Sequence, residues 1–147
     1  MITPHVKTFK NNQERGKDLE KRWMAYLHNR GFWVRFMHPA PDGSQPFDIL
    51  ALKGAGNQGL AMVCAFDCKT LSGKRFPLGR VEDNQLTAFE LLNRKGIHNT
   101  YFVVETEYNK VYLLPSDYVQ KCYYDGNKSI DMEECGYGHF HLEQDIH

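Results

Sequence analysis

The run LAMVCAFDCKT, residues 60–70, constrains the fold of this chain more than any other stretch. It has the apolar character of a buried strand, but it carries an acid at Asp67 and a base at Lys69. Because successive side chains of a strand point to opposite faces of a sheet, these two charges share one face. They are therefore expected to act together, or to pair with each other, at the end of a packed strand.

The remaining sequence alternates between helix and strand patterns. One stripe at spacings of three and four residues predicts a helix over residues 12–30, with Gly31 just after its end. The stripe consists of Gly16, Glu20, Trp23 and Leu27. Apolar and aromatic runs predict strands at 32–38, 47–52, 60–70, 100–107 and 110–115. A second helix is expected from about 81 to 95, and a short third helix over 116–122 with Ser116 as its N-cap.

This order predicts an α/β fold, a mixed sheet flanked by helices, in which strands 47–52 and 60–70 form a hairpin through a Gly-rich turn at 53–59. The 147 residues fit a single domain over 1–147, with its core at about 9–122. Residues 123–147 are rich in glycine and acids. They are expected to form an extension without regular structure.

Composition narrows the class of protein. Hydrophobic residues make up 41% of the chain, and no apolar run approaches the roughly 20 residues that span a bilayer. The first 17 residues contain no apolar segment typical of a secretory signal, which favours a cytoplasmic protein. The 18 basic and 18 acidic residues balance, so net charge by itself does not point to nucleic acid. The cysteines do not form a secreted disulfide framework and are expected to be reduced thiols: Cys64, Cys68, Cys122 and Cys135.

Two further acids lie where a carboxylate is not expected. Asp48 stands at the start of the strand PFDILAL, and Glu20 shares the helical stripe with Trp23. A buried carboxylate is costly unless it is paired or binds a cation. Carboxylate oxygens suit Mg²⁺, which binds one or two carboxylates together with waters and a substrate phosphate. With a lysine beside the ion, the chemistry indicated is phosphodiester hydrolysis.

The pattern of Asp48, a hairpin, and then Asp67, one residue and Lys69 resembles the PD-(D/E)xK nuclease superfamily. Ordered blocks across residues 9–122 are similar to those of RecU-type Holliday-junction resolvases. The blocks are GKDLEKRW at 16–23, PFDILAL at 46–52, FDCKT at 66–70, FPLGRVEDNQ at 76–85 and VYLLP at 111–115. The resemblance implies a restriction-endonuclease-like mixed sheet flanked by helices.

The same resemblance implies a role for each matching residue. Asp48 and Asp67 would be metal ligands, and Lys69 the catalytic lysine. Glu20 would be the helix-borne acid that assists the metal site. Gln85 matches a glutamine that can hydrogen-bond the lysine region or the DNA.

Two departures from the family's pattern stand out. The family usually has Glu where this chain has Asp67. The family's long stalk, used on branched DNA, would fall between Met37 and Phe47, where this chain has only HPAPDGSQP.

The function implied is that of a Mg²⁺-dependent DNA endonuclease of recombination and repair, with Mn²⁺ as a substitute. It would act as a homodimer on branched DNA in a bacterial or phage-infected cell. One alternative is a nuclease of the same fold that acts on flapped, nicked or foreign duplex DNA. Another is a non-catalytic DNA-binding or inhibitory protein that kept the fold.

Each candidate residue also has a plainer interpretation. Asp67 and Lys69 can form a strand-end ion pair, worth about 0–1 kcal/mol if exposed. Glu20 can face solvent, Asp48 can cap a turn, and Gln85 can be an ordinary helix residue.

The basic loop LSGKRFPLGR and the second half of the first strand offer phosphate contacts. The candidate DNA-binding residues are Lys74, Arg75, Arg80 and Arg35. The alternative is a solvated basic loop with an arginine that extends to water. Near the end, Cys135, His139 and His141 are zinc-binding residue types, but their spacing favours a surface tail.

Overall fold

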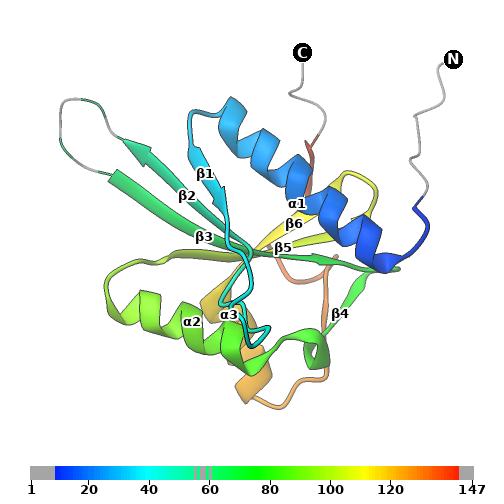
Figure 1. Ribbon diagram of the computed structural model, residues 1–147. Helices are drawn as coiled ribbons and strands as arrows, with labels where there is room; N and C mark the ends of the chain where they lie inside the picture. The colour runs from blue at the N-terminus through cyan, green and yellow to red at the C-terminus, as the bar shows by residue number, and fades with distance from the viewer. Residues whose placement is uncertain (1–8, 55, 57–58, 60, 143–147) are drawn as a thin grey trace, which may run out of the picture.

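A computed structural model describes residues 9–54, 56, 59 and 61–142 of the chain. Within these residues, six strands form a mixed sheet in the order β1-β2-β3-β5-β6-β8, and two short strands, β4 and β7, form a second sheet. Helix α1 covers one face of the large sheet, and α2 and α3 cover the other (Figure 1). The elements are α1 (Asn12–Asn29), β1 (Trp33–Phe36), β2 (Ile49–Gly54), β3 (Ala61–Thr70), β4 (Arg75–Pro77), the 3₁₀ turn η2 (Leu78–Arg80), α2 (Asp83–Arg94), β5 (Asn99–Glu107), β6 (Lys110–Pro115), α3 (Ser116–Tyr124), β7 (Ser129–Asp131) and β8 (Phe140–His141).

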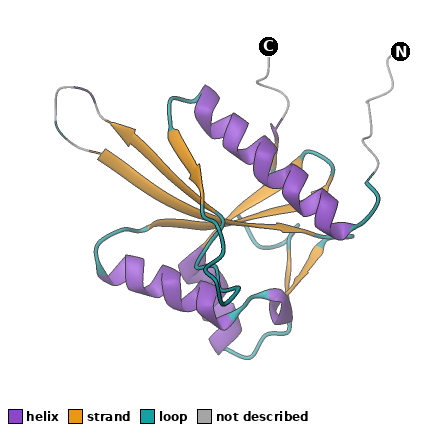
Figure 2. Ribbon diagram, in the orientation of Figure 1, coloured by secondary structure: helices purple, strands orange, loops and turns teal. Residues whose placement is uncertain are grey.

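The predicted α/β class and the mixed sheet flanked by helices are confirmed (Figure 2). Strands β2 and β3 pair antiparallel from Ile49↔Phe66 to Gly54↔Ala61, as the hairpin prediction required. Strands β3 and β5 pair parallel, so the segment with α2 is a crossover connection. Residues 55, 57 and 58 of the predicted Gly-rich turn lie outside the described residues, as do 1–8, 60 and 143–147.

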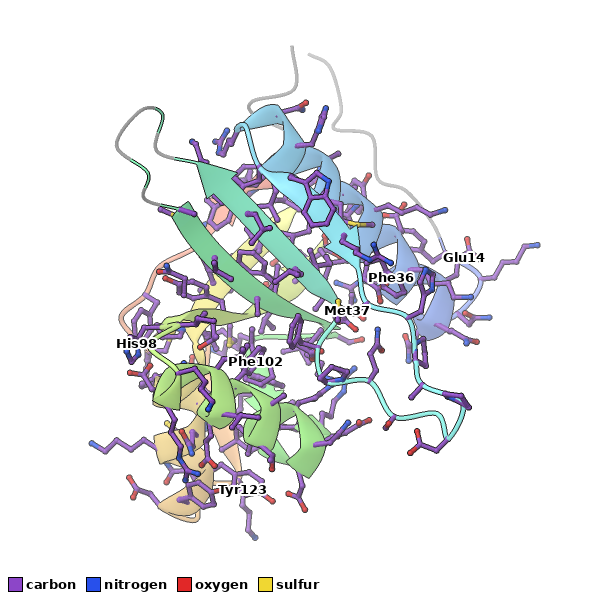
Figure 3. All side chains as sticks on the ribbon, turned by 60° about the vertical axis from the view of Figure 1, so that its left-hand side comes forward. Glu14, Phe36, Met37, His98, Phe102 and Tyr123 are labelled. Atoms are coloured by element: carbon purple, nitrogen blue, oxygen red, sulfur yellow. The ribbon has the colours of Figure 1, made fainter. Side chains whose placement is uncertain are left out.

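Each face of the sheet packs against its own helices, and alternation along β3 decides which side chains go where. Phe66 points to α1, where its ring meets Trp23 edge-on at a centroid distance of 5.3 Å. Its neighbours Ala65 and Asp67 point to the opposite face. There Phe89 of α2 meets Phe102 of β5 edge-on at a centroid distance of 5.3 Å. Phe102 is labelled in Figure 3. The Asp67 and Lys69 side chains therefore lie on the α2 side of the sheet.

A buried ionic network joins α1 to the end of β5. The Glu105 side chain is fully buried, and its Oε2 lies 2.6 Å from Arg22 Nη1. Its Oε1 accepts from Arg15 Nε at 3.3 Å, while Oε2 also accepts from the backbone N–H of Asn109 at 3.0 Å. Arg22 in turn donates to Asp18 at 2.6 Å. Protein donors thus replace water around this carboxylate, which meets the requirement that a buried charge be paired.

The expectation of an unstructured C-terminal segment is wrong for its described part. Strand β7 pairs with β4, and β8 adds an edge to the large sheet beside β6. Ile130, Met132 and Leu142 are buried, so the segment completes the core instead of trailing from it. Strands of two and three residues are too short for a periodic signal, which is why the pattern did not predict them.

The helix ends differ in detail from the prediction. Ser116 is not an N-cap: it lies inside α3, after Pro115, and its hydroxyl is 2.6 Å from Thr100 Oγ1 in a buried pair. Helix α2 begins at Asp83, two residues later than expected, because Glu82 forms its cap. No helix of the described residues is both long enough and apolar enough to cross a membrane.

Candidate active site

Asp48 and Asp67 are brought together by strand register. The β2–β3 pairing starts at Ile49↔Phe66, and the Asp48 N–H extends it by donating to the Phe66 carbonyl at 3.0 Å. Asp48 therefore stands opposite Asp67 at the open end of the hairpin. Its Oδ2 accepts from the Cys68 N–H at 2.7 Å, which fixes the carboxylate beside β3.

Burial raises the proton affinity of both carboxylates. The pKa of Asp67 lies well above its ordinary value, because of burial first and the charge of Asp48 second. Burial also raises the pKa of Asp48, while the Cys68 N–H opposes this by stabilising the charged form. Like charges at directly opposed strand positions repel. In the metal-free protein the pair must hold a proton or carry an uncompensated charge.

Lys69 lies on the same face and supplies partial compensation. Its Nζ is 3.2 Å from Asp67 Oδ2, and its side chain is largely buried. Even so, Asp67 Oδ2 accepts no well-formed hydrogen bond from any described residue, although it is inaccessible to solvent. A buried carboxylate oxygen without such a donor fits a cation ligand.

Gln85 orients the other oxygen of Asp67. Its Nε2 donates to Asp67 Oδ1 at 3.1 Å, and its Oε1 accepts from the Glu82 N–H at 3.2 Å. The second contact belongs to a capping box at the start of α2, with Glu82 as the N-cap. The helix terminus thus positions the Gln85 amide. The Gln85 amide therefore contacts Asp67, whereas the sequence resemblance implied a contact with the lysine region or with DNA.

Glu20 approaches the pair from α1 and the other face of the sheet. It is half-buried, and its pKa is raised to about 7 by desolvation, then by the charge of Asp48, with Lys17 opposing. Across the described ranges, no three or more His, Cys, Asp and Glu side chains gather into a cluster that could hold a metal ion. Two carboxylates do suit Mg²⁺, which completes its shell with waters and substrate phosphates. The residues present therefore fit Mg²⁺ at Asp48 and Asp67, with Glu20 as a charge nearby.

The raised pKa of Glu20 predicts a pH dependence for the metal-free protein. A carboxyl with an ordinary pKa of 4.5 when unfolded and about 7 when folded stabilises the fold below pH 4.5, and this contribution disappears as pH rises through 7. We expect the melting temperature in EDTA to fall between pH 5 and 8, and to fall less in Glu20→Gln. Thermal denaturation of both proteins at pH 5, 6, 7 and 8 measures the difference. Parallel pH curves for the two proteins would contradict the raised pKa.

The predicted DNA-binding residues have different surroundings. Lys74 and Arg75 face acids of the C-terminal segment, with nitrogen–oxygen distances of 3.9 Å to Glu133 and 4.0 Å to Asp131. These exposed pairs are weak and leave the cations accessible. Arg80 donates to the Thr70 carbonyl at the end of β3. Arg35 is exposed on β1, on the face away from α1. Their role in DNA binding stays a prediction.

Sequence reasoning missed two contributors. Glu82 and Gln85 stand three residues apart before an apolar run, the spacing of a capping box, and that signal was present in the chain. Glu105 is an acid within the apolar strand YFVVETE, just as Asp67 is within β3. Of the zinc-binding residue types near the C-terminus, His139 makes an aromatic contact, with its ring centroid 5.5 Å from that of Tyr112.

Comparison with known proteins places the chain in a family. The model of the family described as RecU, recombination protein U, matches residues 58–147. The chain belongs to the RecU family. The resemblance read from the sequence is thereby confirmed. The match includes Asp67, Lys69 and Gln85, while Glu20 and Asp48 precede it.

A solved structure is similar in fold over a larger share of the chain. The Holliday junction resolvase Hjc of Archaeoglobus fulgidus, an archaeal hyperthermophile, superimposes with a TM-score of 0.51 at 15% identity, covering 70% of this chain and 74% of that one. At this identity the likeness shows a shared fold. No curated relative matches the sequence. A RecU-family chain thus has the mixed α/β fold of an archaeal resolvase, and the candidate site lies at the open end of its β2–β3 hairpin.

Proposed function

We propose that this RecU-family chain is a Mg²⁺-dependent DNA endonuclease that hydrolyses phosphodiester bonds in branched DNA, as a homodimer. The observation that carries the proposal is the buried Asp67 carboxylate. One oxygen is oriented by Gln85, and the other has Lys69 at 3.2 Å but no well-formed hydrogen bond. Placing Asp48 opposite this group is costly for stability, and a divalent cation offsets that cost.

Each side chain of the site has a separate role in the proposed hydrolysis. Asp48 and Asp67 would hold Mg²⁺, through Asp67 Oδ2 and the Asp48 carboxylate. The bound ion would stabilise the negative charge that develops on the phosphate oxygens. Lys69 Nζ lies 3.2 Å from Asp67 Oδ2 and would orient the attacking water. As the water oxygen bonds to phosphorus, the bond from phosphorus to the bridging oxygen breaks, and the proton that the water gives up is delivered through solvent to the leaving oxygen. Gln85 holds Asp67 in place throughout by its hydrogen bond to Oδ1.

Membership of the family supports branched DNA as the substrate, and the dimer is proposed from the geometry of the reaction. Junction resolution needs two cuts and hence two active sites, which a symmetric pair of chains supplies. The loop between β1 and β2 favours a second candidate, cleavage of flapped or nicked DNA. It is short and folded on itself, with the Ala40 N–H donating to the Ser44 carbonyl at 2.7 Å, and Asn84 of α2 holds the Gln45 carbonyl at 2.9 Å. No stalk extends from this described segment to enter a junction.

A cleavage assay tests the proposal. Four-way junction, flap, nicked and linear duplex DNA are each incubated with Mg²⁺, with Mn²⁺ or with EDTA. We expect cleavage of the junction with either metal and none in EDTA. Lys69→Met should lower the rate by about 10²-fold, because the attacking water loses the group that orients it. Preferential cutting of the flap or nick would instead support the second candidate.

Two controls accompany the assay. Lys53→Met changes a lysine exposed on β2, away from the carboxylates, and should leave the rate unchanged. A metal titration followed by melting temperature separates a catalyst from a non-catalytic relative, because an ion at 100 times its Kd stabilises the fold by about 2.7 kcal/mol. Cleavage that persists in EDTA, or no thermal response to either metal, would contradict the proposal.

A further inference from the structure

A small apolar pocket opens beside Glu20, between α1 and the end of β1. Its volume is about 210 Å³, and it is lined by Lys17, Glu20, Lys21, Met24 and Phe36. The first four recur at spacings of three and four residues, so they form a single stripe of α1. Phe36 is the last residue of β1 and lies alongside this stripe (Figure 3). The pocket therefore has an apolar floor, an acid in its wall and two lysines at its rim.

The pocket lies close to Asp48, one of the two carboxylates of the candidate metal site. Phe36 pairs with Ile49, and the next N–H, that of Met37, donates to the Asp48 carbonyl at 2.7 Å. Glu20 belongs to the pocket wall, and its pKa is raised by burial first and by the charge of Asp48 second, which indicates that the two carboxylates lie near each other. A DNA strand with its phosphate at Asp48 and Asp67 would thus place a neighbouring nucleotide at this opening.

We propose that the pocket receives one unstacked base of the DNA strand, next to the scissile phosphate. This inference rests on the proposed nuclease function and deepens it by naming the recognised feature of the substrate. The volume is below the 300–1,000 Å³ of drug-sized sites, which suits one ring system. The ring of Phe36 offers a stacking surface, and His38 packs against it edge-on at 5.2 Å. Stacking of a base on an aromatic side chain is worth about 1–3 kcal/mol.

The charges around the pocket favour a nucleotide over an apolar protein side chain as its occupant. An apolar protein side chain would fill the floor but would bring no anion to Lys17 and Lys21. A nucleotide suits both the apolar floor and the two lysines, since its base is uncharged and its phosphates are anionic. Both lysine side chains are exposed and can extend to a phosphate, although Lys17 also interacts with the charge of Glu20.

The pocket also provides a physical basis for selecting branched over linear DNA. Moving a base out of a duplex costs a few kcal/mol, and least where the base is already unpaired or strained. Branch points, flaps and nicks contain such bases. A chain whose β1–β2 loop is short would then recognise branching by capturing a base at Phe36.

The test uses 2-aminopurine, a fluorescent base whose emission reports stacking, placed in turn at each position around the branch point of a four-way junction and a flap. Binding is measured in EDTA, so that the readout does not depend on cleavage. We expect a fluorescence change at one position with wild-type protein. That change should disappear in Phe36→Leu, which keeps an apolar floor but removes the ring, and in Met24→Trp, which fills the pocket. Both variants should bind branched DNA about 5–150-fold more weakly, the equivalent of 1–3 kcal/mol, and linear duplex as before.

The control is Trp33→Leu, an exposed aromatic residue of the same strand that points to the other face, and it should change neither readout. Far-ultraviolet circular dichroism checks that each variant is folded. Unchanged fluorescence and affinity in folded Phe36→Leu and Met24→Trp overturn the inference. If DNA is not cleaved but the signal depends on Phe36, the nuclease proposal fails, while the binding of an unstacked base in the pocket stands. If DNA is cleaved without dependence on Phe36, the reverse holds.

Discussion

Replacing Asp67 by asparagine is expected to abolish metal-dependent cleavage and, at the same time, to raise the melting temperature of the metal-free protein. Cleavage is lost because a neutral amide is a poor ligand for Mg²⁺. Stability rises because the folded wild type must bury a charge opposite Asp48 or take up a proton, and the unfolded chain does neither. The substituted amide avoids both costs, and its oxygen can still accept from Gln85. The loss of the 3.2 Å contact between Asp67 Oδ2 and Lys69 Nζ reduces this gain.

The pH dependence of this stability gain follows from the direction in which the pKa of Asp67 is shifted. Burial and the charge of Asp48 raise the pKa of Asp67 well above 3.8. A raised carboxyl pKa stabilises the fold below pH 3.8, and this contribution is lost as pH rises. The advantage of Asp67→Asn in EDTA should therefore be larger at pH 8 than at pH 5. Each 1 kcal/mol corresponds to roughly 2–4 °C in a domain of this size.

Thermal denaturation and a junction-cleavage assay measure the two effects on the same protein samples. With Mg²⁺ added, the wild type should gain stability and the variant should not. Glu107→Gln removes an exposed acid at the end of β5 and should change neither readout. A variant that cleaves at the wild-type rate, or that melts lower than wild type at both pH values, would show that Asp67 is an ordinary ion-pair residue.

Much of the site could be predicted because it depends on local alternation. Asp67 and Lys69 share a face of β3 in any sheet that buries this strand. Asp48 also stood out as an acid at the start of an apolar run. What alternation could not supply was the register, since a hairpin turn of unspecified length allows several pairings. The pairing Ile49↔Phe66 is what sets Asp48 opposite Asp67.

The parts that were missed depend on contacts between distant segments. Strands β7 and β8 are short and exist because β4 and β6 offer them edges. Ser116 looks like a cap in the sequence, but a buried partner, Thr100, is available to its hydroxyl across the fold. Tertiary partners of this kind override local propensity and leave no periodic signal.

The network around Glu105 is the clearest case of such a distant contact, and its removal is expected to have the largest effect on stability. Glu105→Ala would leave the Arg15 and Arg22 guanidinium groups, both largely buried, without their shared carboxylate. Breaking a buried ion pair by removing one partner costs about 3–5 kcal/mol. We expect a loss of this size in urea denaturation, with a melting temperature lower by roughly 10 °C.

Glu107→Ala is the matched control, two residues further along the same strand but exposed, and it should change stability by less than about 0.5 kcal/mol. Equal effects of the two substitutions would show that the Glu105 network contributes little. The network also holds α1 against the sheet, and α1 carries Glu20 and the pocket stripe. Glu105→Ala should therefore weaken the binding of branched DNA. It should leave the positions of Asp48 and Asp67 unchanged, because the register of β2 and β3 sets them.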